Sequence, residues 1–127
     1  MDIINLHTHT VFSDGENTPR EMIEAALDAG LTTIGFSDHS YTPFDESYCM
    51  KAEHYEEYKA EISKLKEEYK DKIKVLCGIE QDYYAPKTAT DFDYIIGSLH
   101  YFKFGNEYVA VDEDAETLIK AANKYLD

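Results

Sequence analysis

The alternation of short apolar runs with helical patterns is the feature that most constrains the fold. Four runs of apolar or β-branched residues are typical of buried strands: residues 3–6, 32–37, 74–79 and 92–98. Apolar residues at helical spacing follow the first two runs, over residues 18–30 and 53–71. Strands that alternate with helices in this way predict an α/β fold with a largely parallel sheet.

Local signals mark the ends of several elements. Thr18 can cap a helix, Pro19 suits its first position, and Glu21 completes a capping box. Gly30 is a natural stop for that helix. Residues 102–111 predict a hairpin, and a last helix follows from Asp112 or Asp114. A long loop is expected from residue 39 to about residue 52.

The length of the chain limits it to a single domain. The chain has 127 residues, within the usual size of one domain. Four strands are too few to close a barrel of parallel strands and helices. The sequence therefore predicts an open α/β unit, with an exposed sheet edge that another segment should cover.

The charge balance excludes several kinds of partner. Asp and Glu number 26 against 12 Lys and Arg, which gives a formal net charge of -14. Such an acidic chain is a poor ligand for nucleic acid or an anionic membrane, because phosphate backbones attract basic surfaces. The start of the chain lacks the pattern of a signal peptide, and the two cysteines lack metal-type spacing. These features predict a cytoplasmic protein that binds neither nucleic acid nor membrane.

Histidines and carboxylates follow the predicted strands. His7 and His9 come after the first strand, His39 after the second, Glu80 after the third and His100 after the fourth. The carboxyl ends of parallel strands meet at one rim, where such folds place their active sites. We therefore expect these five side chains to converge there.

The donor types at this rim predict a metal centre. His7 and His9 are two positions apart, so in a strand they point to the same side. Imidazoles with carboxylates suit Zn, Mn or Fe, and Glu80 could bridge two ions. Asp14, in the loop after the first strand, is a further oxygen ligand. An isolated pair of histidines is commonly an ordinary loop feature, and His54, in a charged stretch, is interpreted as structural or solvent-facing.

Other catalytic signatures are missing from the sequence. There is no glycine-rich phosphate loop of either common type. Ser37 and Ser98 lack the setting of a nucleophile elbow, which disfavours a serine hydrolase.

Four sequence blocks together resemble the PHP (polymerase and histidinol phosphatase) family. They are NLHTHT at 5–10, FSDHS at 36–40, GIE at 78–80 and DFDYIIGSLHY at 91–101. The last block resembles the histidinol-phosphate phosphatase branch most. The resemblance implies the N-terminal half of a distorted (β/α)7 TIM-like barrel. It also implies hydrolysis of a phosphomonoester such as histidinol phosphate, in histidine biosynthesis, at a cluster of two or three divalent ions.

The resemblance also implies a role for each ligand. His7 and His9 would hold one ion, Glu80 would bridge to a second ion with His100, and His39 would hold a third. The list of expected metal ligands is therefore His7, His9, Asp14, His39, Glu80 and His100. Asp14 and His39 are the candidates for catalytic proton transfer, and Asp38 is expected to orient a neighbour.

The sequence departs from the family after His100. Family members continue into later strands that carry a further histidine, an Asp-x-His pair and a phosphate-binding arginine. No histidine follows His100 here, and Arg20 is the only arginine. We therefore expect residues 1–127 to be a PHP-type domain truncated before the second half of the barrel, which self-associates or binds a complementing chain. Two functions stay open: a metal-dependent phosphatase, or a catalytically incomplete metal-binding fragment or pseudoenzyme that acts by association. An unrelated acidic binding module is the third alternative.

Overall fold

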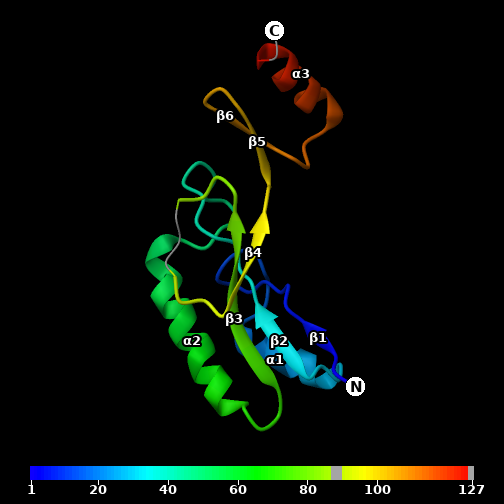
Figure 1. Ribbon diagram of the computed structural model, residues 1–127, viewed down its shortest axis with the longest axis vertical. Coiled ribbons are helices and arrows are strands. Elements are labelled where there is room, and N and C mark those ends of the chain that lie inside the picture. Colours follow the sequence, from blue (N-terminus) through cyan, green and yellow to red (C-terminus); the bar gives the residue numbers. More distant parts are fainter. Residues whose placement is uncertain (87–89, 126–127) are drawn as a thin grey trace.

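A parallel four-stranded sheet with helices on one face forms the body of the protein (Figure 1). The computed structural model describes residues 1–86 and 90–125. The strands of the sheet lie in the order β1-β2-β3-β4, all parallel. Their bounds are β1 Ile4–Asn5, β2 Thr33–Phe36, β3 Lys74–Asp82 and β4 Tyr94–Ser98. Strands β1 and β4 are the two edges of the sheet, so the arrangement is the parallel half-barrel that the sequence predicts.

Helix α1 (Pro19–Asp28) begins and ends where its local signals predict. The hydroxyl of Thr18 accepts a hydrogen bond from the Glu21 amide at 3.2 Å, and Pro19 is the first helical residue. Gly30 follows with a φ of 81°, in the left-handed region that favours glycine. The capping box and the glycine stop are therefore both confirmed.

The hydrophobic core lies between the sheet and helices α1 and α2 (Tyr55–Glu68). Alternate residues of a strand point to the same face. Ile34 and Phe36 of β2 and Val75 and Ile79 of β3 thus point together towards the helices. The helices supply the rest of this buried layer, mainly Ile23, Tyr58, Ile62 and Leu65. This burial fixes the sheet, and with it the positions of the strand ends.

Tyr94 covers the opposite face of the sheet at its centre. Its hydroxyl donates to the carbonyl of Leu6 at 2.6 Å and is 3.0 Å from the carbonyl of Phe36. The ring lies over Gly78 and Gly35, where an added Cβ would come within 2.4 Å of Tyr94. The two glycines are therefore needed for space, and Tyr94 ties β4 to the ends of β1 and β2.

A hairpin and a helix extend beyond the carboxyl end of β4 (Figure 1). The hairpin consists of β5 (Tyr101–Phe104) and β6 (Glu107–Ala110), which pair antiparallel. Helix α3 (Ala115–Tyr125) packs on the hairpin, where the Tyr125 and Phe104 rings stack with centroids 6.1 Å apart. The predicted hairpin and last helix are confirmed, and Asp114 caps α3 by accepting a hydrogen bond from the Thr117 amide.

Three elements differ from the sequence prediction. The expected helix over residues 53–71 divides into a 3-10 turn, η1 (Ala52–His54), and α2, which ends at Glu68. Strand β1 is only two residues long. Strand β3 runs to Asp82 instead of ending at Ile79, because its last residues pair with β4. No helix among the described residues is long and apolar enough to cross a membrane.

Candidate metal centre

The carboxyl ends of four strands bring the expected side chains together. His7 and His9 follow β1, His39 follows β2 and His100 follows β4. Glu80 was expected just after its strand, but it lies inside β3, two residues before the strand ends at Asp82. Its backbone pairs with that of His39, which joins the two strand ends directly.

The carboxylate of Glu80 is the centre of the cluster. Its Oε2 lies 3.3 Å from Nε2 of His7, 2.9 Å from Nε2 of His9 and 3.2 Å from Nδ1 of His39. Its Oε1 lies 3.5 Å from Nε2 of His100. The Glu80 side chain is only 6% exposed. One buried carboxylate therefore faces all four imidazoles.

Asp14 closes the other side of the cluster. Its Oδ1 lies 3.0 Å from Nδ1 of His9, and its Oδ2 lies 3.3 Å from Nε2 of His39. The turn that carries it is tight, since the amides of Ser13 and Gly15 both donate to the carbonyl of Thr10. Asp14 is 41% exposed, so it stands at the boundary between the cluster and solvent.

Asp38 is fully buried, and it holds the turn that carries Asp14. Its carboxylate accepts hydrogen bonds from the Thr10 amide at 2.7 Å and the Thr10 hydroxyl at 2.9 Å. It also accepts from the Ser13 hydroxyl at 2.5 Å. These contacts use both of its oxygens, so Asp38 orients its neighbours, as the resemblance implies, and does not point at the cluster.

Unpaired polar atoms at the centre of the cluster fit a bound cation. Nε2 of His9 and Oε2 of Glu80 are buried and have no hydrogen-bond partner, although they are 2.9 Å apart. Buried polar atoms are normally hydrogen-bonded, and an unpaired one needs an explanation. A divalent cation supplies it, because each atom can then donate an electron pair.

The six expected ligands form three overlapping groups of three. The groups are His7, His9 and Glu80; His9, Asp14 and His39; and His39, Glu80 and His100. His9 and His39 each belong to two groups. A neutral imidazole has one acceptor nitrogen, so each histidine can serve only one ion. At most two of the three groups can therefore be complete at one time: with His9 in the first group and His39 in the third, which share Glu80, only Asp14 remains for the second.

The environment of His39 favours its neutral, ligating form. Burial lowers the pKa of His39 below its ordinary value, and repulsion from His9 adds to the effect. Attraction to Glu80 and Asp14 opposes the shift. A neutral imidazole keeps the lone pair that a metal ion requires.

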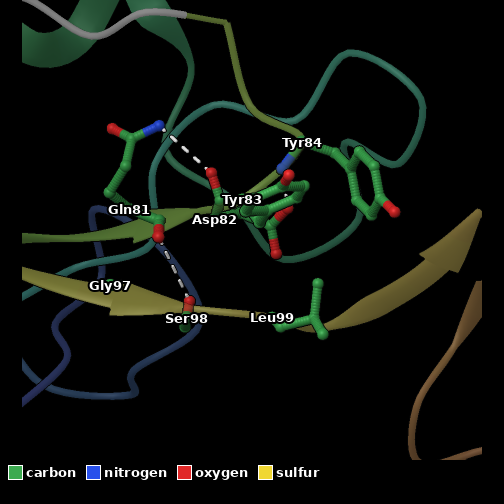
Figure 2. Close-up of a pocket in the computed structure, with 7 residues that line it drawn as sticks. All are labelled: Gln81, Asp82, Tyr83, Tyr84, Gly97, Ser98 and Leu99. Carbon is green, nitrogen blue, oxygen red and sulfur yellow. Dashed lines mark hydrogen bonds between the residues drawn. The ribbon is translucent and has the colours of Figure 1, made fainter.

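A cleft of about 490 Å³ opens onto the cluster. Asp14, His39 and His100 form its inner side, and Tyr48 and Tyr101 lie beside them. The Tyr48 ring contacts the His39 ring with its edge, with centroids 4.8 Å apart. A larger cavity, of about 650 Å³, lies where β3 and β4 end, and Figure 2 shows the residues that line it. The lining of that cavity lacks a histidine, so the smaller cleft is the better candidate for chemistry.

Sequence reasoning missed two residues at this site, Asp82 and Tyr48, and correctly excluded His54. His54 is away from the cluster and its nearest acidic partner is Glu53, at 3.8 Å. Asp82 was missed, although it follows Glu80 at the spacing that puts two strand residues on the same face. Tyr48 was also missed, and no signal in the long loop distinguishes it.

The fold and the cluster define a class: a parallel α/β half-barrel with histidines and carboxylates gathered at the carboxyl ends of its strands. Comparison with known families agrees. The PHP domain model matches residues 5–126, and the chain therefore belongs to the PHP domain family.

Named relatives resemble the chain in sequence over most of its length. A probable histidinol-phosphatase from Deinococcus radiodurans is 38% identical over 126 residues, which cover 87% of this chain and 48% of the relative. The histidinol-phosphatase of Bacillus subtilis is 33% identical, with the same coverage of 87% and 48%. The chain thus spans about half the length of these curated relatives.

A solved structure also resembles this chain. It is a histidinol phosphate phosphatase from Lactococcus lactis, complexed with zinc, L-histidinol and phosphate. The two chains align with a TM-score of 0.66 at 28% identity, over 97% of this chain and 50% of the other.

Proposed function

We propose that this chain provides the metal-binding half of a phosphomonoester hydrolase of the histidinol-phosphatase type. The observation that carries the proposal is the buried, unpaired Oε2 of Glu80, which faces His7, His9 and His39 at 2.9–3.3 Å. The named relatives support histidinol phosphate as the substrate. We further propose that residues 1–127 are one PHP-type unit, whose barrel is completed by another segment or another copy.

The spacing of the donor atoms suits a small divalent ion. A tetrahedral zinc site with bonds of about 2.0–2.1 Å places its ligand atoms about 3.3–3.4 Å apart. The His7 and Glu80 atoms are 3.3 Å apart, those of His39 and Glu80 are 3.2 Å apart, and those of His39 and Asp14 are 3.3 Å apart. Zn, Mn and Fe all accept such a mixed set, and we propose two or three ions.

The ligands divide in the order that the resemblance implies. His7 and His9 would hold one ion, with Glu80 shared between that ion and a second one near His100. His39 and Asp14 would hold a third ion. When bound, such ions activate water and neutralise the charge of a phosphate group. The acidic chain needs this neutralisation, because its net charge of -14 would otherwise repel the substrate.

Asp14 and His39 are proposed to handle the proton of the leaving group. Both line the cleft, so an ester oxygen seated there can reach either side chain. Asp38 contributes indirectly, since its hydrogen bonds to Thr10 and Ser13 hold the turn that presents Asp14.

A second function, metal binding without turnover by the chain alone, is favoured by one observation. The four imidazoles can complete at most two of the three groups of protein ligands among the described residues. Arg20, the sole arginine, is also engaged on α1, where it makes a two-pronged contact with Glu68. In this alternative the chain acts only in association with another chain.

Phosphate release from histidinol phosphate tests both functions. The purified chain is loaded with Zn or Mn, and bound metal and released phosphate are measured in parallel. We expect the double variant His7→Ala/His9→Ala to lose metal and any turnover, whereas His54→Ala, outside the cluster, keeps both. Metal binding without turnover would favour the second function. Metal binding that survives the double variant would contradict the proposed centre altogether.

A further inference from the structure

We propose that Asp82 is a positioning residue that fixes the tautomer of His100 and so aims its second nitrogen at the metal cluster. The inference rests on the proposed metal centre, but it concerns a residue outside the three ligand groups. Asp82 lies in β3, two residues after Glu80, and is 3% exposed.

Asp82 contacts His100 in two ways. Its Oδ2 lies 3.0 Å from Nδ1 of the His100 ring and accepts a hydrogen bond from the His100 amide at 3.2 Å. Its Oδ1 accepts from the Tyr84 amide at 2.9 Å. Both oxygens therefore face N–H groups of fixed position. Figure 2 shows Asp82 beside Tyr84, with Ser98 on the neighbouring strand.

These contacts select one tautomer. An ionised carboxylate only accepts hydrogen bonds, so the ring nitrogen that faces Asp82 must carry the proton. Nε2 is then left with a lone pair, which points to the other side of the ring. There it meets Oε1 of Glu80 at 3.5 Å, which is also an acceptor. Two acceptors that face one another without a proton leave a natural position for a cation.

His100 differs in this respect from the other histidines. His9 and His39 each face Asp14 with one nitrogen and Glu80 with the other, so both of their partners belong to the ligand groups. For His100, Nδ1 faces a carboxylate outside those groups. The Ser98 hydroxyl also lies 3.3 Å from Nδ1, but it already donates to the Gln81 carbonyl and is the more distant of the two.

The first experiment reads the tautomer directly. Nitrogen NMR of the metal-free chain, labelled at histidine, is recorded at about pH 9, where imidazoles are neutral. A His100→Gln variant assigns the signal. We expect the Nδ1–H form at His100, whereas a free imidazole favours Nε2–H. An Nε2–H signal for His100 in the unaltered chain would overturn the proposal, and the role of Asp82 is thus tested without altering Asp82 itself.

The second experiment replaces Asp82 by asparagine. The amide keeps the shape but turns one acceptor into a donor, which then opposes either the His100 ring or the Tyr84 amide. We expect the tautomer to change and the affinity for one zinc ion to fall about 10–100-fold, the usual effect of losing such a partner. The matched control is Asp93→Asn, since Asp93 also accepts a backbone amide, that of Cys77, away from the cluster.

The outcomes separate this proposal from the proposed function. A folded Asp82→Asn chain with unchanged tautomer and unchanged zinc affinity would refute the role of Asp82. Failure of the unaltered chain to bind zinc would instead refute the metal centre, and the tautomer of His100 would still decide the role of Asp82.

Discussion

Replacement of Gly78 by alanine tests the packing that holds the sheet together. An ideal Cβ at Gly78 would lie 2.4–2.6 Å from three carbons of the Tyr94 ring. The ring must then move, and its hydroxyl loses the carbonyls of Leu6 and Phe36. Gly97 provides the matched control, because a Cβ there meets nothing within 4 Å.

The expected loss is up to a few kcal/mol. The Tyr94 hydroxyl has one proton, so the hydrogen bond that is lost contributes about 0.5–1.5 kcal/mol. Overpacking costs about 1–3 kcal/mol more. The change from glycine to alanine offsets about 0.5–1 kcal/mol of this loss, because glycine is the poorer strand residue. We therefore expect Gly78→Ala to lower the free energy of unfolding by about 0.5–4 kcal/mol, whereas Gly97→Ala leaves it unchanged or slightly higher.

Urea denaturation followed by circular dichroism measures both variants, and a double-mutant cycle isolates the cause. Tyr94→Ala removes the ring, so Gly78→Ala should cost little in that background. Additive losses in the double variant, or a Gly78→Ala chain as stable as Gly97→Ala, would refute the steric argument.

Three further predictions follow from the structure. Thr18→Ala should lower the free energy of unfolding by about 0.5–2 kcal/mol, because α1 loses its N-terminal cap. Thermal unfolding measures the loss, and an unchanged midpoint would contradict the prediction. The lowered pKa of His39 means that the folded, metal-free chain prefers the neutral ring, so its contribution to stability is full above the ordinary pKa of 6.5 and is lost as the pH falls below that value. The urea midpoint should change less between pH 7 and pH 5 in His39→Gln than in His54→Gln. An equal change in the two variants would show that His39 does not cause the loss of stability at low pH. Burial raises the pKa of the Cys77 thiol to about 12, and Asp93 makes a smaller contribution. In the Cys49→Ser variant, Cys77 is the remaining thiol, and it should react with a disulfide reagent at pH 8 far more slowly in the folded chain than in the chain unfolded by urea. Equal rates would show that the thiol is accessible in the folded chain.

The site was largely predictable because its geometry follows from topology. His7, His9, His39 and His100 each follow a strand, and parallel strands in one sheet bring their carboxyl ends together whatever the details of packing. The capping signals at Thr18 were likewise local, and they needed no knowledge of the rest of the chain.

The missed features depend on contacts between distant segments. The role of Asp82 follows from the register that pairs it with Ser98 in β4, and sequence periodicity does not give that register. The same pairing extends β3 past Glu80, which the sequence placed after the strand. Tyr48 lies in a loop without periodicity, whose path is set by long-range contacts such as that of the Tyr55 hydroxyl with the Tyr41 amide.

Helix α3 is held less firmly than the body of the protein. No residue of α3 is buried, and Ile119 is 58% exposed. Hydrogen exchange reports local opening, which requires little free energy where few apolar contacts must break. Amides of α3 should therefore exchange first, those of β5 and β6 later, and those of β3 only with global unfolding. Helix α3 should thus open separately from the rest of the protein, while the cluster at the strand ends stays assembled.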